Sequence, residues 1–164
     1  MIDIKKINSL DKSEFLSIFG NVFEKSKWIS EKVFDLKPYD SLESFTSKIL
    51  EVYDNSNKET ILKILNLHPE LAIEKKLTSN SESEQTKANL KECTPKEFNE
   101  FKKLNFDYKK KFNFPFIIAV KGKKKTEILN IFKERINNNL EKEFLEAKNQ
   151  VKKIAMFRLE EIIK

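Results

Sequence analysis

Glycine and proline are so scarce in this chain that few positions force a helix to stop. Only two of the 164 residues are Gly and four are Pro. Since both residue types interrupt helices, long segments are free to stay helical. A predicted capping box of Asp11 with Glu14 is followed by apolar residues spaced as one continuous helical face, namely Phe15, Ile18, Phe19, Val22 and Phe23. The sequence therefore predicts an all-α fold.

Other segments also carry helix start signals, in which a polar cap residue precedes an apolar stripe or stands three residues before Glu. These are Asp40 with Glu43, Asn57, Ser81 with Glu84, and Thr94-Pro95 with Glu97. In the third of them Ser81 is the predicted N-cap and Glu84 lies at position N3. A long final helix is predicted over residues 140–163.

One segment breaks the helical rhythm. Residues 114–120 form an uninterrupted apolar run that ends at Lys121 and Gly122. The run has the pattern of a buried strand, but the sequence offers no second convincing strand to pair with it. We therefore predict a buried extended segment near residues 114–121 inside a helical protein. Its backbone groups need polar partners, and a bound substrate is one such partner.

Size and charge limit the class of protein. At 39% hydrophobic residues, a chain of this length is predicted to form one domain over 1–164. It has no apolar stretch of about 18 residues and no signal-like start, so we expect a cytoplasmic, bacterial protein that binds no membrane. The net charge of +6 keeps open a basic helical module that binds nucleic acid or a partner helix. However, only Arg135 and Arg158 are arginines, the residue that bidentate phosphate and base contacts favour.

His68 is the only histidine and the clearest candidate for chemistry. It precedes Pro69, which disfavours a helical conformation in the residue before it, so His68 is predicted at a helix-to-turn corner. An imidazole, with an ordinary pKa of about 6.5, suits proton transfer at neutral pH, and a capping or surface histidine is the structural alternative. Because no second His is present and Cys93 is the only cysteine, we predict neither a metal site nor a disulfide.

Residues 81–85 have two interpretations. As a capping box they are purely structural. A helix N-terminus with a serine hydroxyl, backbone N–H groups and a carboxylate is also suited to a polar, anionic small molecule. The lysine runs at 109–111 and 123–125 are typical of solvated faces, whereas Lys121 directly follows the apolar run.

Several motifs, taken in order, resemble the OHCU decarboxylase family. They are His68-Pro69-Glu70-Leu71-Ala72, Ser81-x-x-Glu84-Gln85, Leu104-Asn105-x-x-Tyr108 and Phe112-x-Phe114-Pro115-Phe116-Ile117-Ile118. Further similar positions are Gly122, Ile128, Arg135, Asn137, Glu143, Ala147 and the ending Val151-x-x-Ile154-Ala155-x-x-Arg158-Leu159. The resemblance spans nearly the whole chain, and its specificity lies in the ordered set rather than in any single motif.

This resemblance implies an all-helical, commonly dimeric enzyme of urate degradation. Its reaction converts 2-oxo-4-hydroxy-4-carboxy-5-ureidoimidazoline to (S)-allantoin and carbon dioxide without a cofactor. We accordingly expect a small-molecule substrate, a homodimer and no nucleic-acid partner.

The resemblance also implies roles for residues. His68 corresponds to the catalytic histidine and Glu84 to a second acid/base or orienting residue. Substrate contacts are implied for Pro69, Ser81, Glu82, Ser83, Gln85, Phe116, Ile117, Ile118, Ala119, Val120 and Lys121, with Lys121 or Lys123 standing where the family often has Arg. We expect His68 and Glu84 to converge on one buried cleft beside the extended segment. Backbone groups from Ile117 to Val120 are expected to bond the amide edges of the substrate.

The chain departs from the family pattern at three points. Ile73 and Asn89 stand where the family has Gly, and Asn is the side chain that best tolerates a left-handed backbone. The connection from His68 to Glu84 (84 − 68 = 16 positions) is a few residues shorter than typical.

Overall fold

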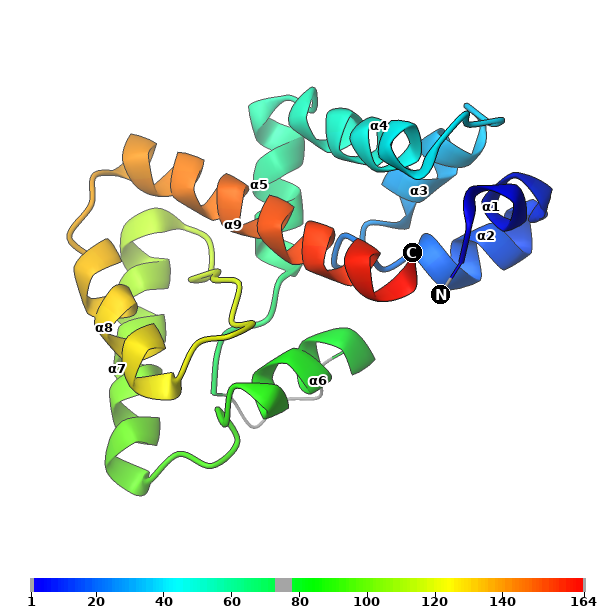
Figure 1. Cartoon of the computed structure of the whole chain (residues 1–164). Coiled ribbons are helices and arrows are strands. Elements are labelled where there is room, and N and C mark those ends of the chain that lie inside the picture. Colours follow the sequence, from blue (N-terminus) through cyan, green and yellow to red (C-terminus); the bar gives the residue numbers. More distant parts are fainter. Residues whose placement is uncertain (1, 73–77, 164) are drawn as a thin grey trace. The chain divides into compact units, whose positions relative to one another are not determined.

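The protein is helical in the part that the structure describes, residues 2–72 and 78–163. The computed structural model contains α1 (Ile4–Ser9), α2 (Lys12–Phe19), α3 (Lys27–Phe34), α4 (Leu42–Asp54), α5 (Lys58–Leu67), α6 (Ser79–Lys87), α7 (Pro95–Phe112), α8 (Lys125–Arg135) and α9 (Leu140–Ile162) (Figure 1). No β-strand occurs among these described residues, where Ile2 and Ile163 form an isolated parallel bridge. The predicted all-α fold is confirmed. Within the same residues, no helix combines the length and apolar character needed to cross a membrane.

Three predicted helix starts are confirmed by their hydrogen bonds. The Asp11 carboxylate accepts from the Glu14 N–H at 2.8 Å, and the Glu14 carboxylate accepts from the Asp11 N–H at 3.0 Å. Thr94 and Glu97 form the same reciprocal pair at the start of α7, with a proline at the first helical position. Asn57 accepts from the backbone of the first turn of α5 at 2.8 Å. Each side chain satisfies a backbone group that the helix itself leaves unpaired.

Two other predicted starts are wrong. The N-cap of α4 is Ser41 and not Asp40. The N-cap of α6 is Thr78, whose side chain accepts from the Ser81 N–H, so Ser81 does not cap the helix and Glu84 lies in its second turn. Polar residues stand at several neighbouring positions here, and an earlier cap adds residues to the helix and therefore backbone hydrogen bonds.

One predicted helical face is also shorter than expected. α2 ends at Phe19 with Gly20 as its C-cap, and the chain turns before α3. Val22 and Phe23 are buried from this turn and not from a helix. Gly costs a helix interior about 1 kcal/mol relative to Ala, which favours stopping at this position.

The chain groups into two compact units, which are described separately. The first takes the residues up to Ile64 and those from Lys152 on, and the second is Leu65–Val151. Helices α5 and α9 therefore contribute residues to both units. The expected single domain over 1–164 stays a prediction.

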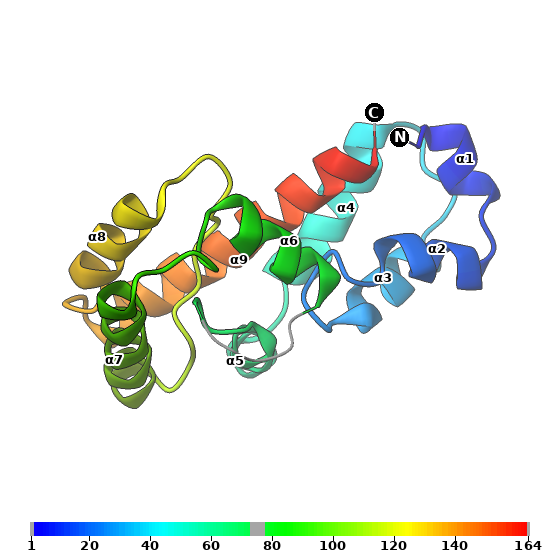
Figure 2. The same ribbon diagram turned by 90° about the horizontal axis from the view of Figure 1, so that it is seen from below.

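Aromatic side chains form the centre of the first unit, where α2 packs on α3 and α3 on α4. The Phe19 ring centroid lies 4.8 Å from that of Phe15 and 5.0 Å from that of Phe45. A buried ion pair between Arg158 and Glu24, 3.0 Å apart, joins α9 to the turn after α2. The two ends of the chain lie side by side in this unit (Figure 2).

The second unit is built around the fully buried ring of Tyr108 on α7. Four aromatic rings surround it, with centroids 4.6 to 5.9 Å away, and these are Phe112, Phe114, Phe116 and Phe132. Between α7 and α8 the chain runs without regular structure over residues 115–120 (Figure 1), and the exposed fraction of each of these residues is low enough to class it as buried. The predicted buried extended segment is therefore confirmed over residues 114–120, whereas Lys121 is exposed in the turn that follows.

Candidate active site

His68 occupies the corner that its sequence context predicts. It follows the last residue of α5, its N–H donates to the Leu65 carbonyl at 3.2 Å, and Pro69 leads the chain out of the helix. Only 8% of the residue is exposed to solvent, which excludes the surface histidine of the structural alternative. A buried imidazole at the end of a helix is suited to proton transfer in a site that is poorly solvated.

The chain directly after His68 is held by two buried amides. The Gln85 side chain on α6 accepts from the Ala72 N–H and donates to the Glu70 carbonyl, each at 3.1 Å. Asn105 on α7 donates to the Leu71 carbonyl at 2.9 Å. Together these bonds fix the backbone of three consecutive residues, including Ala72 with its left-handed φ of 51°. The turn that carries His68 is therefore anchored to α6 and α7 within the second unit.

Asn105 is a functional candidate for which the sequence alone suggested no separate role. It is 4% exposed, and no hydrogen-bond partner for its buried Oδ1 exists among the residues that the structure describes. A signal was present, because Asn105 follows Phe101 by four residues and precedes Tyr108 by three, which places an amide on an otherwise apolar helical face.

The residues of α6 divide between two sides of the helix. Ser81, Glu84 and Gln85 are spaced i, i+3, i+4, so they share the face from which Gln85 bonds the turn after His68. Ser81 and Gln85 are buried, and Glu84 is partly buried.

Glu82 and Ser83 are both exposed. Lys91 bonds Glu82 at 2.5 Å, and this hydrogen bond lowers the pKa of the Glu82 carboxyl. Of the residues expected from α6, Ser81 and Glu84 thus share the face of Gln85, and Glu82 and Ser83 are exposed. The expected convergence of Glu84 and His68 on one cleft stays a prediction.

Side chains of the protein satisfy part of the backbone of the extended segment. The Ile117 carbonyl accepts from Arg135 Nη1 at 2.7 Å, and the Ala119 N–H donates to Gln150 Oε1 at 2.9 Å. The Val120 carbonyl accepts from the Lys123 N–H at 3.0 Å. These three groups therefore already have partners within the protein, because a buried carbonyl or N–H takes the nearest polar partner that the fold supplies. The expected contact of substrate with the backbone of residues 117–120 stays a prediction.

Arg135 is itself fixed by a buried network. Its Nε and Nη2 donate to Glu143 Oε1 at 2.9 and 2.6 Å, and its guanidinium carbon lies 4.4 Å from the Phe116 ring centroid. The same Glu143 oxygen accepts from the Tyr108 hydroxyl at 2.5 Å, while Oε2 accepts from Asn138. Burial raises the pKa of Tyr108, and its bond to Glu143 raises it further. Sequence reasoning noted Arg135 and Glu143 as motif positions but predicted no contact between them.

The basic residues after the extended segment lie at its edge. Lys121 is exposed and Lys123 is partly buried, in a turn where Gly122 has a φ of 76°. Their expected contact with a substrate carboxylate stays a prediction.

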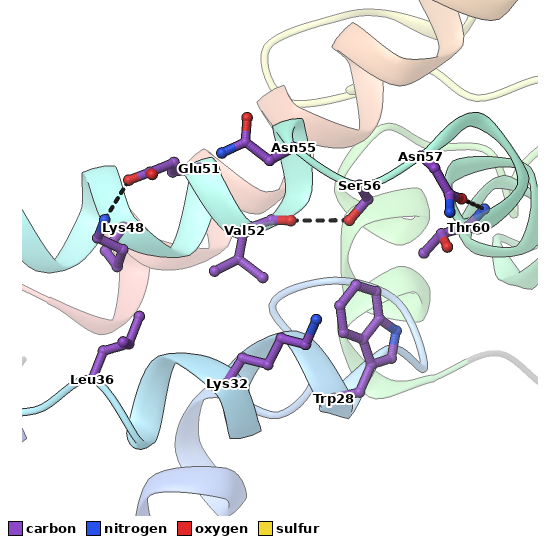
Figure 3. Close-up of a pocket in the computed structure, with 10 residues that line it drawn as sticks. All are labelled: Trp28, Lys32, Leu36, Lys48, Glu51, Val52, Asn55, Ser56, Asn57 and Thr60. Atoms are coloured by element: carbon purple, nitrogen blue, oxygen red, sulfur yellow. Dashed lines mark hydrogen bonds and ion pairs between the residues drawn. The ribbon is translucent and has the colours of Figure 1, made fainter.

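A separate cavity lies in the first unit. It has a volume of about 650 Å³ and is lined by residues of α3 and α4, by the turns that follow these helices and by Thr60 of α5. Figure 3 shows Trp28 and Lys32 on one side facing Val52 on the other, with Lys32 Nζ 5.1 Å from the Trp28 ring centroid. None of the predicted site residues lines this cavity. The predicted site residues all belong to the second unit.

The residues that the structure describes do not gather metal ligands at one place. Among these residues, no cluster of three or more His, Cys, Asp or Glu side chains could hold a metal ion. Cys93 is free and partly buried, and burial raises the pKa of its thiol.

Comparisons with known proteins agree over most of the chain. The sequence profile described as "OHCU decarboxylase" matches residues 8–160. The "Uric acid degradation bifunctional protein" of Bacillus sp. (strain TB-90) is 42% identical over 164 residues, which is 100% of this chain and 33% of that protein. The chain thus spans about a third of that relative's length. The "2-oxo-4-hydroxy-4-carboxy-5-ureidoimidazoline decarboxylase" of Halalkalicoccus jeotgali is 32% identical, with 98% of this chain and 92% of that protein covered.

A solved structure gives the same result for the fold. The crystal structure of (S)-allantoin synthase superimposes with a TM-score of 0.81 at 26% sequence identity, covering 100% of this chain and 54% of that one. With a matching family profile over nearly the full length and a relative of similar length above 30% identity, the chain belongs to the OHCU decarboxylase family.

Proposed function

We propose that this protein removes the carboxyl group of 2-oxo-4-hydroxy-4-carboxy-5-ureidoimidazoline, forming (S)-allantoin and carbon dioxide in urate degradation without a cofactor. The observation that carries the proposal is the buried His68, held on a turn whose backbone is fixed by Gln85 and Asn105. The substrate is inferred from the names of relatives in the family, such as the decarboxylase of Halalkalicoccus jeotgali.

The substrate can accept the electrons that decarboxylation releases. When the bond between the ring carbon and the carboxylate breaks, its electron pair forms a C=C bond to the neighbouring carbon, and the C=N pair of that carbon moves onto the ring nitrogen, which takes up a proton. Loss of the hydroxyl proton then gives the carbonyl, and a proton added to the neighbouring carbon on one face gives a single enantiomer. The protein needs to hold the carboxylate in a poorly solvated pocket and to move protons.

His68 is proposed as the base that takes the hydroxyl proton, because its ordinary pKa lies near neutrality. Glu84 is proposed to orient the ring or the ureido group from the face of α6 that carries Gln85. Ser81 shares that face, and Pro69 adjoins the histidine, so both are proposed to contact substrate. For Glu82 and Ser83, which are exposed, contact with substrate stays a prediction.

The test is to generate the unstable substrate in situ and follow the circular dichroism of allantoin. We expect a stereospecific signal with the wild-type protein and a loss of at least about 10²-fold in His68→Ala, since general acid/base catalysis contributes about 10²–10⁴-fold. Cys93→Ser is the matched control and should keep full activity. Helical content should be unchanged in both variants. Activity of His68→Ala within tenfold of wild type would remove His68 from this role.

We further propose a homodimer in the cytoplasm that does not bind nucleic acid. Light scattering during size-exclusion chromatography tests the dimer. The alternative of a basic nucleic-acid-binding module is tested by DNA retention, which counterion release would make steeply dependent on salt. Retention of DNA that falls steeply with salt, together with no turnover of the ureidoimidazoline, would favour that alternative.

A further inference from the structure

The extended segment is held from one edge by two different helices. In an extended chain the N–H and C=O of alternate residues point to the same edge. The Ile117 carbonyl and the Ala119 N–H fit this rule, since they are met by Arg135 of α8 and Gln150 of α9. The backbone groups of Ile118 then point toward the opposite edge. The N–H of Ile118 can donate a hydrogen bond to an amide or ureido group, and its C=O can accept one from the same group.

Gln150 is oriented for this contact by a second hydrogen bond. Its Nε2 donates to Glu146 Oε1, one helical turn earlier on α9, at 2.6 Å. This bond uses the amide nitrogen and leaves Oε1 directed at the Ala119 N–H. Gln150 is 8% exposed, so water does not readily replace either bond. The amide therefore has one orientation, and with it the Ala119 N–H has one position.

We propose that Gln150 is a positioning residue for the decarboxylation: by holding the Ala119 N–H at one edge of the segment, it fixes the position of the opposite edge, at Ile118, which receives the substrate. This inference rests on the proposed function. Arg135 holds the same edge as Gln150, through the Ile117 carbonyl, and its guanidinium is fixed by Glu143 and by stacking on Phe116. Gln150 lies outside the reacting groups and acts only through the backbone that it holds.

The decisive variant is Gln150→Leu, which keeps the approximate size of the side chain and removes the acceptor. We expect KM to rise about tenfold while kcat stays within about threefold, because the loss falls on the binding edge and not on the proton transfer at His68. A purely structural defect gives the opposite pattern, since a smaller folded fraction lowers apparent kcat and leaves KM unchanged. The amide hydrogen of Ala119 should also exchange faster with solvent in this variant.

Two further variants complete the design. Asn149→Leu makes the same amide-to-leucine change at an exposed position of α9 and should behave as wild type. The double variant Glu146→Gln/Gln150→Glu exchanges the two side chains, so a carboxylate can again accept from Ala119 while the new amide donates to it. We expect this exchange to restore KM to within about threefold of wild type.

The outcomes separate the two proposals. No allantoin formation by the wild-type protein overturns both the proposed function and this inference. An active wild type with the same KM in Gln150→Leu as in Asn149→Leu, or with a fall in kcat alone, overturns only the positioning role. A raised KM that the exchanged pair does not restore likewise overturns it, because the acceptor at position 150 is then not what matters.

Discussion

Breaking the buried pair of Arg135 and Glu143 should strongly destabilise the second unit, because it leaves one charge buried without a partner. Glu143 is fully buried and accepts hydrogen bonds from Tyr108, Asn138 and two nitrogens of Arg135, which is itself 7% exposed. Glu143→Gln keeps the size of the side chain but leaves a buried guanidinium without its counter-charge. Breaking such a pair costs about 3–5 kcal/mol. With a urea dependence of about 2 kcal/mol per molar, the unfolding midpoint should fall by roughly 2 M.

A double-mutant cycle identifies the origin of this cost. Arg135→Met alone should also lower the free energy of unfolding by about 3–5 kcal/mol, since it leaves the Glu143 carboxylate buried without a counter-charge. Arg135→Met/Glu143→Leu removes both charges together, so its cost should fall short of the sum of the single changes by about 3 kcal/mol or more. The assay is urea unfolding followed by the circular dichroism of the helices. Costs that add within about 0.5 kcal/mol would refute the coupling, as would a Glu143→Gln cost below about 1 kcal/mol.

Three other predictions concern stability. Burial raises the pKa of all three tyrosines, Tyr39 to about 12, and the pKa of Tyr53 and Tyr108 rises as well. Because these folded-state values lie above the ordinary value of 10.0, the stability that they contribute is complete below pH 10 and is lost as pH rises toward 12 and beyond. Tyrosinate absorbance should therefore appear only with unfolding, and a rise near pH 10 with the helices intact would contradict this. Asn89 has a φ of 57°, so Asn89→Ala should lower the free energy of unfolding in urea by about 1–2 kcal/mol, and Asn89→Gly should lower it less. Equal losses in the two variants would argue against backbone strain as the reason. Thr94→Ala removes the capping hydroxyl of α7 and should lower the protein's free energy of unfolding by about 1 kcal/mol in thermal denaturation, whereas Thr94→Ser should not. A similar loss in both variants would exclude the capping hydroxyl as the cause.

Local signals predicted most of the helical framework. Scarce glycine and proline, the Asp11 and Thr94 boxes and the Asn57 cap all act over three or four residues, and the structure confirms them. The corner at His68 depends on the neighbouring Pro69, and the left-handed backbone at Asn89 on the asparagine itself, so both also result from local interactions. At α6 both Thr78 and Ser81 have side chains suited to an N-cap, and the local pattern did not identify Thr78 as the residue that caps the helix.

The candidate site depends on longer-range contacts. Gln85 meets Ala72 across 13 positions, Asn105 meets Leu71 across 34, and Gln150 meets Ala119 across 31. No spacing rule relates such residues, because they become neighbours only after the helices have packed. For the same reason, the sequence predicted a buried extended segment but not that Arg135 and Gln150 bond its backbone.

The sequence by itself determined that the chain is helical, where most helices begin, and that an imidazole stands at a helix end. Only the tertiary structure decided which polar groups hold the two irregular buried segments, namely the turn after His68 and the extended segment at residues 114–120. The physical reason is that a helix satisfies its own backbone within four residues, whereas an irregular buried segment must take its hydrogen bonds from whatever side chains the packed fold brings to it.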